Sequence, residues 1–593
     1  MTIPHIPCAS PNVQHLSTAA SRRAANTVAA LTLVTTLACG AGTSGTATPA
    51  TPDVTTTAAV PPVVTDPRLP RTRAERTSYG ETSHFTDVVA FLDSLRRLGA
   101  PLAFGTIGTT NENRAIPYVI ASRPLVSTPA AARASGKPIV YVQGNIHAGE
   151  IEGKEALQAL VRDLVYQSRA NVLDSIVLIA VPIYNADGNE RFADQARNRG
   201  SQNGPPMVGQ RPNAQGLDLN RDYMKVDAPE TQASLRTFNE WNPDVFVDLH
   251  TTNGSYHGYA LTYAPSLNPA GDIAPAFMAG AYARDSLLPE LRRRVRSRRG
   301  YETFDYGNFA SQDSVEKGWF TYDHRPRFGT NYYALRGRIS VLSEAYSHDP
   351  FARRVASTYA FVSELLSLVS ERGARIRAMS ARADSAVVAW GRAAAGPQIP
   401  IRGDLTTTPY TGEVIVETLE TTTDTARTEP GVRRGIRRTG TFRRVRMPVY
   451  DRFVSTLAMR PAWGYAFAAA DSSAVRVLKQ HGVTLQRVGS ACSAPGESFT
   501  VDSVVVSPNA FQGRREVRVE GRWQRGDVRL EPGTHVVSLA QPLGVAATYL
   551  LDPRSDDGLV TWNVGNRAAN GRLEHVPMRL LSTAPSACGL GPA

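Results

Sequence analysis

The feature that most constrains this chain is a regular alternation, between residues 82 and 392, of short apolar runs with longer amphipathic ones. Four apolar runs have the length and composition of buried strands: residues 139–142, 176–181, 245–249 and 339–342. Between them, apolar residues recur at helical spacing, as in Leu157, Leu160 and Val161. Strands that alternate with helices predict an α/β fold with a mixed, mostly parallel sheet and flanking helices.

The length and composition predict more than one folded domain. The chain has 593 residues, of which 42% are hydrophobic and 20% are charged. This composition is globular, and the length exceeds what one ordinary core supports. After residue 396 the sequence pattern changes: Thr and Val alternate with polar residues, and turn residues recur at short intervals. We therefore expect an α/β domain at 71–395 and a mostly β domain at 396–593.

The N-terminus has the pattern of an export signal. Residues 1–39 contain a basic Arg22-Arg23 pair and an apolar run that is too short for a confident membrane span. The run ends at a site that resembles a bacterial lipoprotein cleavage site, with Cys39 as the lipidated residue. Residues 40–70, rich in Thr, Ala, Gly and Pro, predict a flexible tether. We expect export to the periplasm or cell surface, with lipid attachment to a membrane or simple secretion as alternatives.

The cysteines predict a disulfide rather than a metal site. None of the four has the close CxxC spacing of a zinc site. Cys492 and Cys588 are the two that fall in the folded part, and they can pair if the compartment is oxidising. Two free buried thiols are the alternative.

Arginine clusters account for much of the formal net charge of +12. They lie at residues 292–299 and 433–446. Runs of this kind are usually solvated surfaces, and neither regular interleaving with aromatic residues nor a nucleic-acid motif accompanies them. We therefore expect no nucleic-acid partner.

A candidate metal site begins just after the first strand-like run. His147 and Glu150 follow this run three residues apart, and imidazole nitrogen and carboxylate oxygen are both ligands of Zn²⁺. His250 follows another strand-like run and is the candidate third ligand. Asp248, two residues earlier on the same side of that strand, is placed to support the site. A lone histidine at a strand end is usually structural, so the combination carries the prediction.

Two further polar motifs suit the chemistry of such a site. Asn220 and Arg221 together can hold a carboxylate, because Arg offers a planar pair of donors and Asn adds an amide. Glu344 ends a strand-like run, where an unpaired carboxylate is costly to desolvate. It is the candidate general base that takes a proton from an attacking water. A paired structural glutamate is the alternative.

In combination and in this order, these segments resemble the M14 family of zinc carboxypeptidases. The resemblance covers roughly residues 82–392 and includes a turn at 184–188 similar to the family's Asn-Pro-Asp-Gly turn, with Ala in place of Pro. It implies that one Zn²⁺ per chain is bound by His147, Glu150 and His250. It also implies that Glu344 is the general base and that Asn220 and Arg221 hold the terminal carboxylate of a peptide.

The resemblance also implies residues that the motifs alone do not locate. The family has an arginine that stabilises the oxyanion, and Arg197 and Arg199 fall in the corresponding interval; we favour Arg199. A tyrosine closes over the substrate in the family, and Tyr322 and Tyr332 are both candidates. Residues 200–216, rich in Gly, Pro and Asn, resemble an inserted loop that can reshape the specificity pocket.

The sequence therefore predicts a zinc metallocarboxypeptidase that removes C-terminal residues by promoted-water attack. Its substrate is expected to be a peptide, or a peptide-like molecule, with a free carboxylate. A related zinc amidohydrolase acting on N-acyl amino acids or cell-wall peptides is the first alternative. A non-catalytic binding lipoprotein on the same scaffold is the second.

Overall fold

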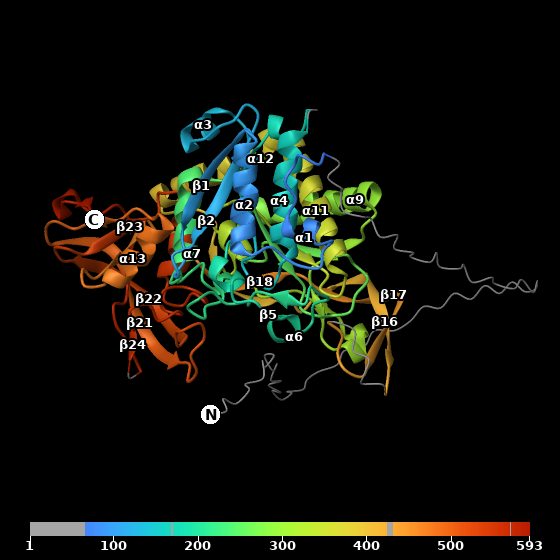
Figure 1. Ribbon diagram of the computed structural model, residues 1–593. Helices are drawn as coiled ribbons and strands as arrows, with labels where there is room; N and C mark the ends of the chain where they lie inside the picture. Colours follow the sequence, from blue (N-terminus) through green and yellow to red (C-terminus); the bar gives the residue numbers. More distant parts are fainter. Residues whose placement is uncertain (1–65, 168–169, 424–430, 570) are drawn as a thin grey trace, which may run out of the picture. The chain divides into compact units, whose positions relative to one another are not determined.

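The computed structural model describes residues 66–167, 170–423, 431–569 and 571–593, and Figure 1 traces them in sequence colours. These residues fall within one compact unit. The predicted signal segment, Cys39 and the tether up to residue 65 lie outside the described residues. Among the helices that are described, none is both long and apolar enough to cross a membrane.

A mixed eight-stranded sheet forms the centre of the region before residue 396, called here the first region. Its spatial order is β1 (Leu102–Thr109), β2 (Ala115–Ala121), β4 (Val177–Val181), β3 (Ile139–Gly144), β7 (Val245–Thr251), β14 (Ile339–Ala345), β8 (Leu261–Pro265) and β11 (Thr303–Asp305). The pairs β3–β4, β3–β7, β7–β14 and β8–β11 are parallel, whereas β1–β2, β2–β4 and β8–β14 are antiparallel. The predicted α/β fold with a mixed sheet is confirmed, and the four predicted strands are its central members.

Helices cover both faces of this sheet because alternate strand residues point to opposite sides. On one face, Val140 and Val142 of β3 pack in a core with the apolar faces of helices that lie near one another in Figure 1: α2 (Phe85–Arg97), α4 (Glu152–Tyr166) and α11 (Phe351–Glu371). On the other face, Ile139 and Tyr141 pack with α7 (Pro229–Trp241). The long helices α9 (Leu288–Arg299) and α12 (Gly373–Ala393) complete this region.

The shorter elements of this region lie in its connections. The short helices are α1 (Arg73–Arg76), α3 (Pro129–Ala134), α5 (Ala186–Asn189), α6 (Gln195–Asn198), α8 (Ala279–Tyr282) and α10 (Gly329–Ala334). The short strands are β5 (Ala193–Asp194), β6 (Met207–Val208), β9 (Asp272–Ala274), β10 (Phe277–Met278), β12 (Asn308–Phe309) and β13 (Trp319–Phe320).

The region after residue 396 is mostly β, as predicted. Its largest sheet has the order β22 (Val517–Leu530), β21 (Cys492–Val506), β26 (Met578–Leu580), β19 (Gly464–Phe467), β23 (His535–Ser538), β20 (Gln486–Arg487) and β27 (Gly591–Pro592). Its other elements are β15 (Ile399–Leu405), β16 (Tyr410–Thr421), β17 (Ile436–Tyr450), β18 (Phe453–Met459), β24 (Ala568–Ala569), β25 (Arg572–Leu573), α13 (Ser472–His481) and α14 (Gly544–Leu551). A disulfide joins Cys492 to Cys588.

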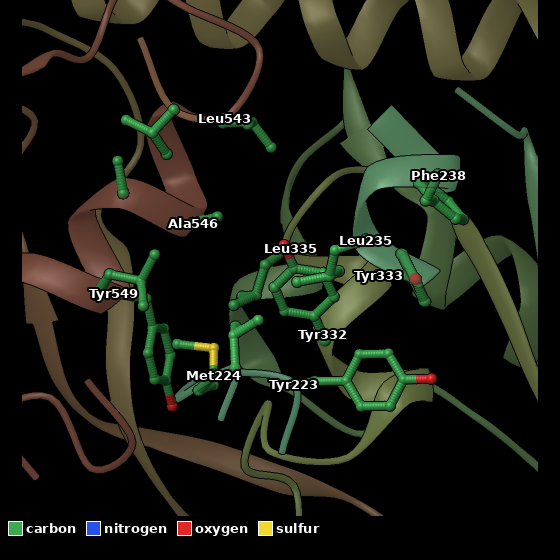
Figure 2. Packing of buried hydrophobic residues seen from close by; sticks show 14 of the residues in the cluster. Tyr223, Met224, Leu235, Phe238, Tyr332, Tyr333, Leu335, Leu543, Ala546 and Tyr549 are labelled. Carbon is green, nitrogen blue, oxygen red and sulfur yellow. The ribbon is translucent and has the colours of Figure 1, made fainter. Parts of the chain in front are cut away.

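The two regions share both a sheet and a core. Strands β12 and β13 join β16 and β17 in one four-stranded sheet. Figure 2 shows Tyr223 and Tyr332 of the first region in one cluster with Ala546 and Tyr549 of α14. The proposed domain boundary near residue 396 stays a prediction, and across it the apolar contacts are continuous.

Candidate metal centre

The candidate ligands meet at one edge of the central sheet. Strands β3, β7 and β14 are parallel neighbours, so their C-terminal ends lie side by side. Within this register Glu344 of β14 is the direct partner of His250 of β7. His147 and Glu150 lie in the loop that leaves β3, where Asn145 adopts a left-handed conformation with φ of 67°. Its amide donates to the carbonyls of Ala148 and Glu150 and so fixes the loop.

His147, Glu150 and His250 form a tight, buried group. The distance from His147 Nδ1 to Glu150 Oε1 is 3.0 Å, and that from His250 Nδ1 to Glu150 Oε2 is 2.9 Å. The two Nδ1 atoms are 3.2 Å apart, and one donor atom from each residue lies within 4.8 Å of the others. Two imidazoles and a carboxylate converging from three sides fit the donor set of a zinc site that leaves a position open.

The outward-facing nitrogen of each imidazole is held by a carboxylate. His147 Nε2 lies 2.9 Å from Asp218 Oδ1, and His250 Nε2 lies 2.9 Å from Asp248 Oδ2. Such contacts fix the ring orientation and leave Nδ1 free to face a metal. The structure therefore supports the role that the sequence suggested for Asp248. It adds Asp218, whose signal in the sequence was its position two residues before Asn220.

The carboxylates of this group have displaced pKa values. Burial by itself would raise the pKa of Glu150, but His147 and Arg199 beside it hold that pKa well below its usual range. Burial would also raise the pKa of Asp218, and the Arg211 guanidinium and His147 lower it well below its usual range. Both groups are therefore anionic at neutral pH, which is the form that attracts a cation.

Glu344 differs from these carboxylates. It is buried, and burial together with the neighbouring charge of Glu150 raises its pKa to about 8 against the opposing effect of His250. Its Oε2 atom has no hydrogen-bond partner among the described residues. A cation bound at the neighbouring group would lower this pKa. A general base needs an oxygen that is free to accept a proton from a water molecule at the metal site. The unpartnered Oε2 of Glu344 meets this requirement.

Two arginines reach Glu150. Arg199 donates to Glu150 Oε1 at 3.0 Å and to the carbonyls of Thr251 and Thr252 at 3.1 Å each, and it is buried. A Cβ added at Gly149 would lie 2.6 Å from Arg199 Cγ, so a glycine is needed for this approach. The alternative, Arg197, is exposed on α6.

Arg211 is the second arginine, and the sequence analysis did not single it out. Its Nη2 lies 2.8 Å from Asp218 Oδ2 and its Nη1 3.4 Å from Glu150 Oε1. About a third of its side chain (32%) is exposed, so it faces the open side of the site. The signal that could have found it is its location in the Gly- and Pro-rich loop at 200–216, which was interpreted as an insertion.

Asn220 and Arg221 lie beside the metal group on the short helical turn Leu219–Arg221. Asn220 Nδ2 is 3.4 Å from His250 Nε2, and its Oδ1 accepts a hydrogen bond from Gly329 N at 2.9 Å. The guanidinium carbon of Arg221 lies 3.9 Å from the centre of the Phe328 ring. Its side chain is 22% exposed, so the cation lies over an aromatic ring while part of it is accessible to a ligand.

The structure separates the two candidate tyrosines. Tyr322 packs edge-on against Phe328, with ring centres 5.2 Å apart, and its hydroxyl lies 2.7 Å from Thr330 Oγ1. Burial raises the pKa of Tyr322, and the charge of Glu344 adds to this shift. Tyr332 is not brought to the site. It lies in the aromatic cluster of Figure 2, and its hydroxyl bonds His481 Nδ1 at 2.8 Å.

Comparison with known proteins agrees with this geometry. Residues 88–274 match the family model Peptidase_M14, described as zinc carboxypeptidase. The match includes His147, Glu150 and His250 and ends before Glu344. A probable carboxypeptidase 2 of Arthroderma benhamiae is 28% identical over 195 residues, which are 32% of this chain and 33% of that protein. Carboxypeptidase 2 of Trichophyton rubrum is 27% identical over 165 residues, 27% of each chain. The chain thus spans about a third of the length of these relatives.

Comparison with solved structures returns carboxypeptidases at low similarity. A metallo-carboxypeptidase from Burkholderia cenocepacia has a TM-score of 0.35 at 18% identity, covering 49% of this chain and 70% of its own. Carboxypeptidase A from Helicoverpa armigera has a TM-score of 0.36 at 16% identity, covering 51% of this chain and 74% of its own.

Proposed function

We propose that the protein is a zinc-dependent metallocarboxypeptidase that releases C-terminal residues from peptides, on the premise that residues 88–274 match the zinc carboxypeptidase family model. The observation that carries the proposal is the convergence of His147, Glu150 and His250 within 4.8 Å, with Glu344 on the adjacent strand end. Within the ranges that the structure describes, no second trio of His, Cys, Asp or Glu has metal-site geometry. This supports one ion per chain.

The side chains around this group divide the work of hydrolysis. A zinc ion held there supplies a Lewis acid that polarises a carbonyl and makes water a better nucleophile. Glu344 accepts the proton of the attacking water at its free Oε2 and delivers it to the departing amine. Arg199 or the more exposed Arg211 offers a guanidinium to the oxyanion that develops on the attacked carbonyl.

Arg221, which lies beside the candidate metal ligands, accounts for recognition of a C-terminus. Arg221 presents a planar pair of donors to a carboxylate, and its contact with the Phe328 ring restricts where the guanidinium lies. Tyr322 packs against the same ring and so lies beside the position that the terminal side chain would occupy. A substrate without a free carboxylate would leave Arg221 with only its long contact to Asp218 at 3.8 Å and its backbone hydrogen bond to Asn220, which disfavours binding.

We further propose that the protein acts outside the cytoplasm. The support is the signal-like pattern of residues 1–39, with Cys39 as a site of lipid attachment and residues 40–70 as a tether. Mass spectrometry of the mature protein purified from its native host tests this proposal. A lipid-modified N-terminal Cys39 supports anchoring, and an unmodified mature N-terminus in the culture medium supports simple secretion. An intact Met1 contradicts export.

Metal content and substrate choice test the catalytic proposal together. Zinc is measured by mass spectrometry in the wild type and in His147→Ala, with His84→Gln as a control at a partly exposed histidine far from the ligands in sequence. All three proteins are then assayed on peptides with free and amidated C-termini and on N-acyl amino acids. We expect about one zinc per chain in the wild type and the control, loss in His147→Ala, and cleavage of peptides with free C-termini. Cleavage of N-acyl amino acids alone would favour the amidohydrolase. Well-folded wild type without zinc and without activity would favour the binding protein.

A further inference from the structure

The C-terminal region reaches the metal centre through one tight turn. Strands β21 and β22 form a long hairpin, and at its tip Phe511 and Arg514 bond to each other through N–H to O=C contacts of 2.7 and 3.0 Å. Between them, Gln512 and Gly513 both have positive φ, 51° and 77°. This is the pattern of a two-residue turn of type I′, in which both central residues are left-handed.

Gln512 touches the segment that orients a metal ligand. The backbone N–H of Asp218 donates to Gln512 Oε1 at 2.7 Å. The same Asp218 holds His147 Nε2 through its Oδ1 and accepts from the backbone N–H of Asn220 at 3.0 Å. Gln512, 294 residues further along the chain, therefore directly contacts Asp218, the residue that orients His147.

Two arginines, each paired with acids, hold the turn against the first region. Arg514 bonds both oxygens of Asp227, at 2.7 and 2.6 Å. Arg327 bonds Glu516 at 2.7 Å and Asp557 at 2.8 Å, and it is almost fully buried. The first pair fixes the segment that continues from Asn220 and Arg221. The second fixes the loop that carries Tyr322 and Phe328.

Aromatic packing completes the contact. The rings of Phe511 and Trp562 are nearly parallel, at 19°, with centres 6.0 Å apart. The guanidinium carbon of Arg327 lies 4.3 Å from the centre of the Trp562 ring and 5.5 Å from that of Phe511. The turn therefore packs on Arg327, which is also bound by Glu516 and Asp557. These contacts restrict the movement of the turn.

The residue at the strained position is itself informative. Glutamine has no preference for positive φ, and the left-handed region is strained for a residue with a Cβ. A glycine at 512 would relieve this strain but would lose the acceptor for Asp218. Persistence of a strained side chain at a contact with a site is a recognised mark of function.

We propose that residues 511–514 of the C-terminal region are part of the active site and that Gln512 is a positioning residue for the metal ligand His147. The inference rests on the proposed function for the identity of the metal. It assigns a role to the C-terminal region, since the site's geometry then depends on a hairpin outside the family-matched residues 88–274.

The test uses the full-length protein and three variants. Gln512→Gly removes the acceptor and relaxes the turn, Gln512→Glu keeps an acceptor oxygen, and Arg522→Ala removes an exposed ion pair with Asp502 on the same hairpin. Zinc affinity is measured by competition with a chelator, and thermal unfolding is measured on the same samples. Removing a group that directly contacts a metal ligand weakens metal binding about 10- to 100-fold. Gln512 contacts Asp218, which in turn contacts the ligand, so for Gln512→Gly we expect zinc affinity to fall by less, about 3- to 10-fold.

A purely structural role and a positioning role give different results. We expect Gln512→Gly to unfold at the same or a higher temperature than the wild type while zinc affinity falls, and Gln512→Glu to stay within about twofold of the wild type, below the 10-fold scale of outer contacts. Arg522→Ala should match the wild type. Unchanged affinity in Gln512→Gly, or a loss shared equally by Gln512→Glu or Arg522→Ala, would overturn the inference. If the wild type binds zinc but cleaves no peptide, the proposed function fails while this test still decides; a wild type that binds no zinc overturns both.

Discussion

Two pairs of buried histidines in this protein have opposite environments. His147 and His250 at the metal centre are each 3% exposed, and His257 and His348, which lie beyond the ends of β7 and β14, are each 1% exposed. Burial is therefore the same in both pairs, and it lowers the pKa of a histidine when nothing opposes it. What differs is the set of groups that each imidazole faces.

At the metal centre the imidazoles face carboxylates. Burial lowers the pKa of His250, but the charges of Asp248 and Glu150 outweigh it and raise that pKa well above its ordinary value. In the second pair the rings face other rings. His348 stacks on Tyr256 with centres 4.1 Å apart, and His257 packs on Tyr346 with centres 4.3 Å apart.

The pKa values of the second pair follow from these neighbours. Burial and the charges of His348 and Arg438 lower the pKa of His257 to about 3, and burial lowers that of His348 to about 4, with Arg438 adding to the effect. Glu417, the acid beside Tyr346, is already paired with Arg438. Two buried histidines close in space therefore do not make a metal site unless carboxylates complete it.

The largest expected effect separates the two pairs directly. His250→Ala removes a ligand and should abolish both zinc binding and peptide hydrolysis, a loss beyond the roughly 100-fold seen for outer contacts. His348→Phe, which keeps the stacked ring, should retain zinc and activity. Metal content and kcat/KM on one peptide measure both. Equal losses in the two variants would contradict the distinction drawn here.

Glu344→Gln should give the next largest effect. The amide cannot accept the proton of the attacking water, so we expect kcat to fall about 10²- to 10⁴-fold. Zinc content should stay at the wild-type level because Glu344 is not one of the three donors. Steady-state kinetics beside metal analysis checks this, and a variant with near wild-type kcat would remove Glu344 from the role of base.

Asp248→Asn is expected to act through the metal. The substitution keeps the shape of the side chain but removes the charge that holds His250 Nε2. We expect zinc affinity to fall about 10- to 100-fold. Chelator competition measures it. Asp384→Asn, at a more exposed ion pair with Arg338, is the control and should leave the affinity unchanged.

The last prediction concerns pH and the second histidine pair, where the change is in stability and not in metal binding or activity. In the unfolded chain His348 titrates near pH 6.5, and in the folded protein its pKa is about 4, so between these values only the unfolded state binds the proton. Its contribution to stability is complete above about pH 6.5 and is lost as pH falls toward 4. The expected slope is about 1.4 kcal/mol per pH unit for each proton.

Urea unfolding between pH 4 and 7 measures this dependence. His348→Phe should flatten the decline by about one proton, while His84→Gln, at a partly exposed histidine, should leave it unchanged. A steep decline that persists in His348→Phe would show that other groups carry it.

The sequence predicted more of the fold and of the metal ligands than of the substrate side. Strand runs such as 245–249 are continuous and apolar, and a polar residue that ends such a run must lie at a sheet edge. His250 and Glu344 could be predicted for this reason. Tyr322 and Tyr332 could not be told apart, because six residues without regular structure lead from Tyr322 to the short helix α10 that contains Tyr332, and nothing local fixes which one faces the site.

Arg211 and Gln512 illustrate what local pattern cannot supply. Arg211 lies in a loop whose Gly and Pro content predicts turns but not the direction of a side chain. Gln512 lies in a hairpin turn of the other region, and its contact with Asp218 joins residues 294 positions apart. Neither has any periodic or motif signal.

The sequence by itself determined the α/β alternation and predicted the candidate ligand trio and the candidate base, because strand periodicity and ligand chemistry are local properties of short segments. The tertiary structure alone decided which carboxylates orient the imidazoles, which arginines reach Glu150, and that Tyr332 belongs to a core shared with α14. It also brought the β21–β22 turn to the metal centre. These contacts depend on packing between distant segments, where burial and charge are set by the whole fold rather than by any stretch of it.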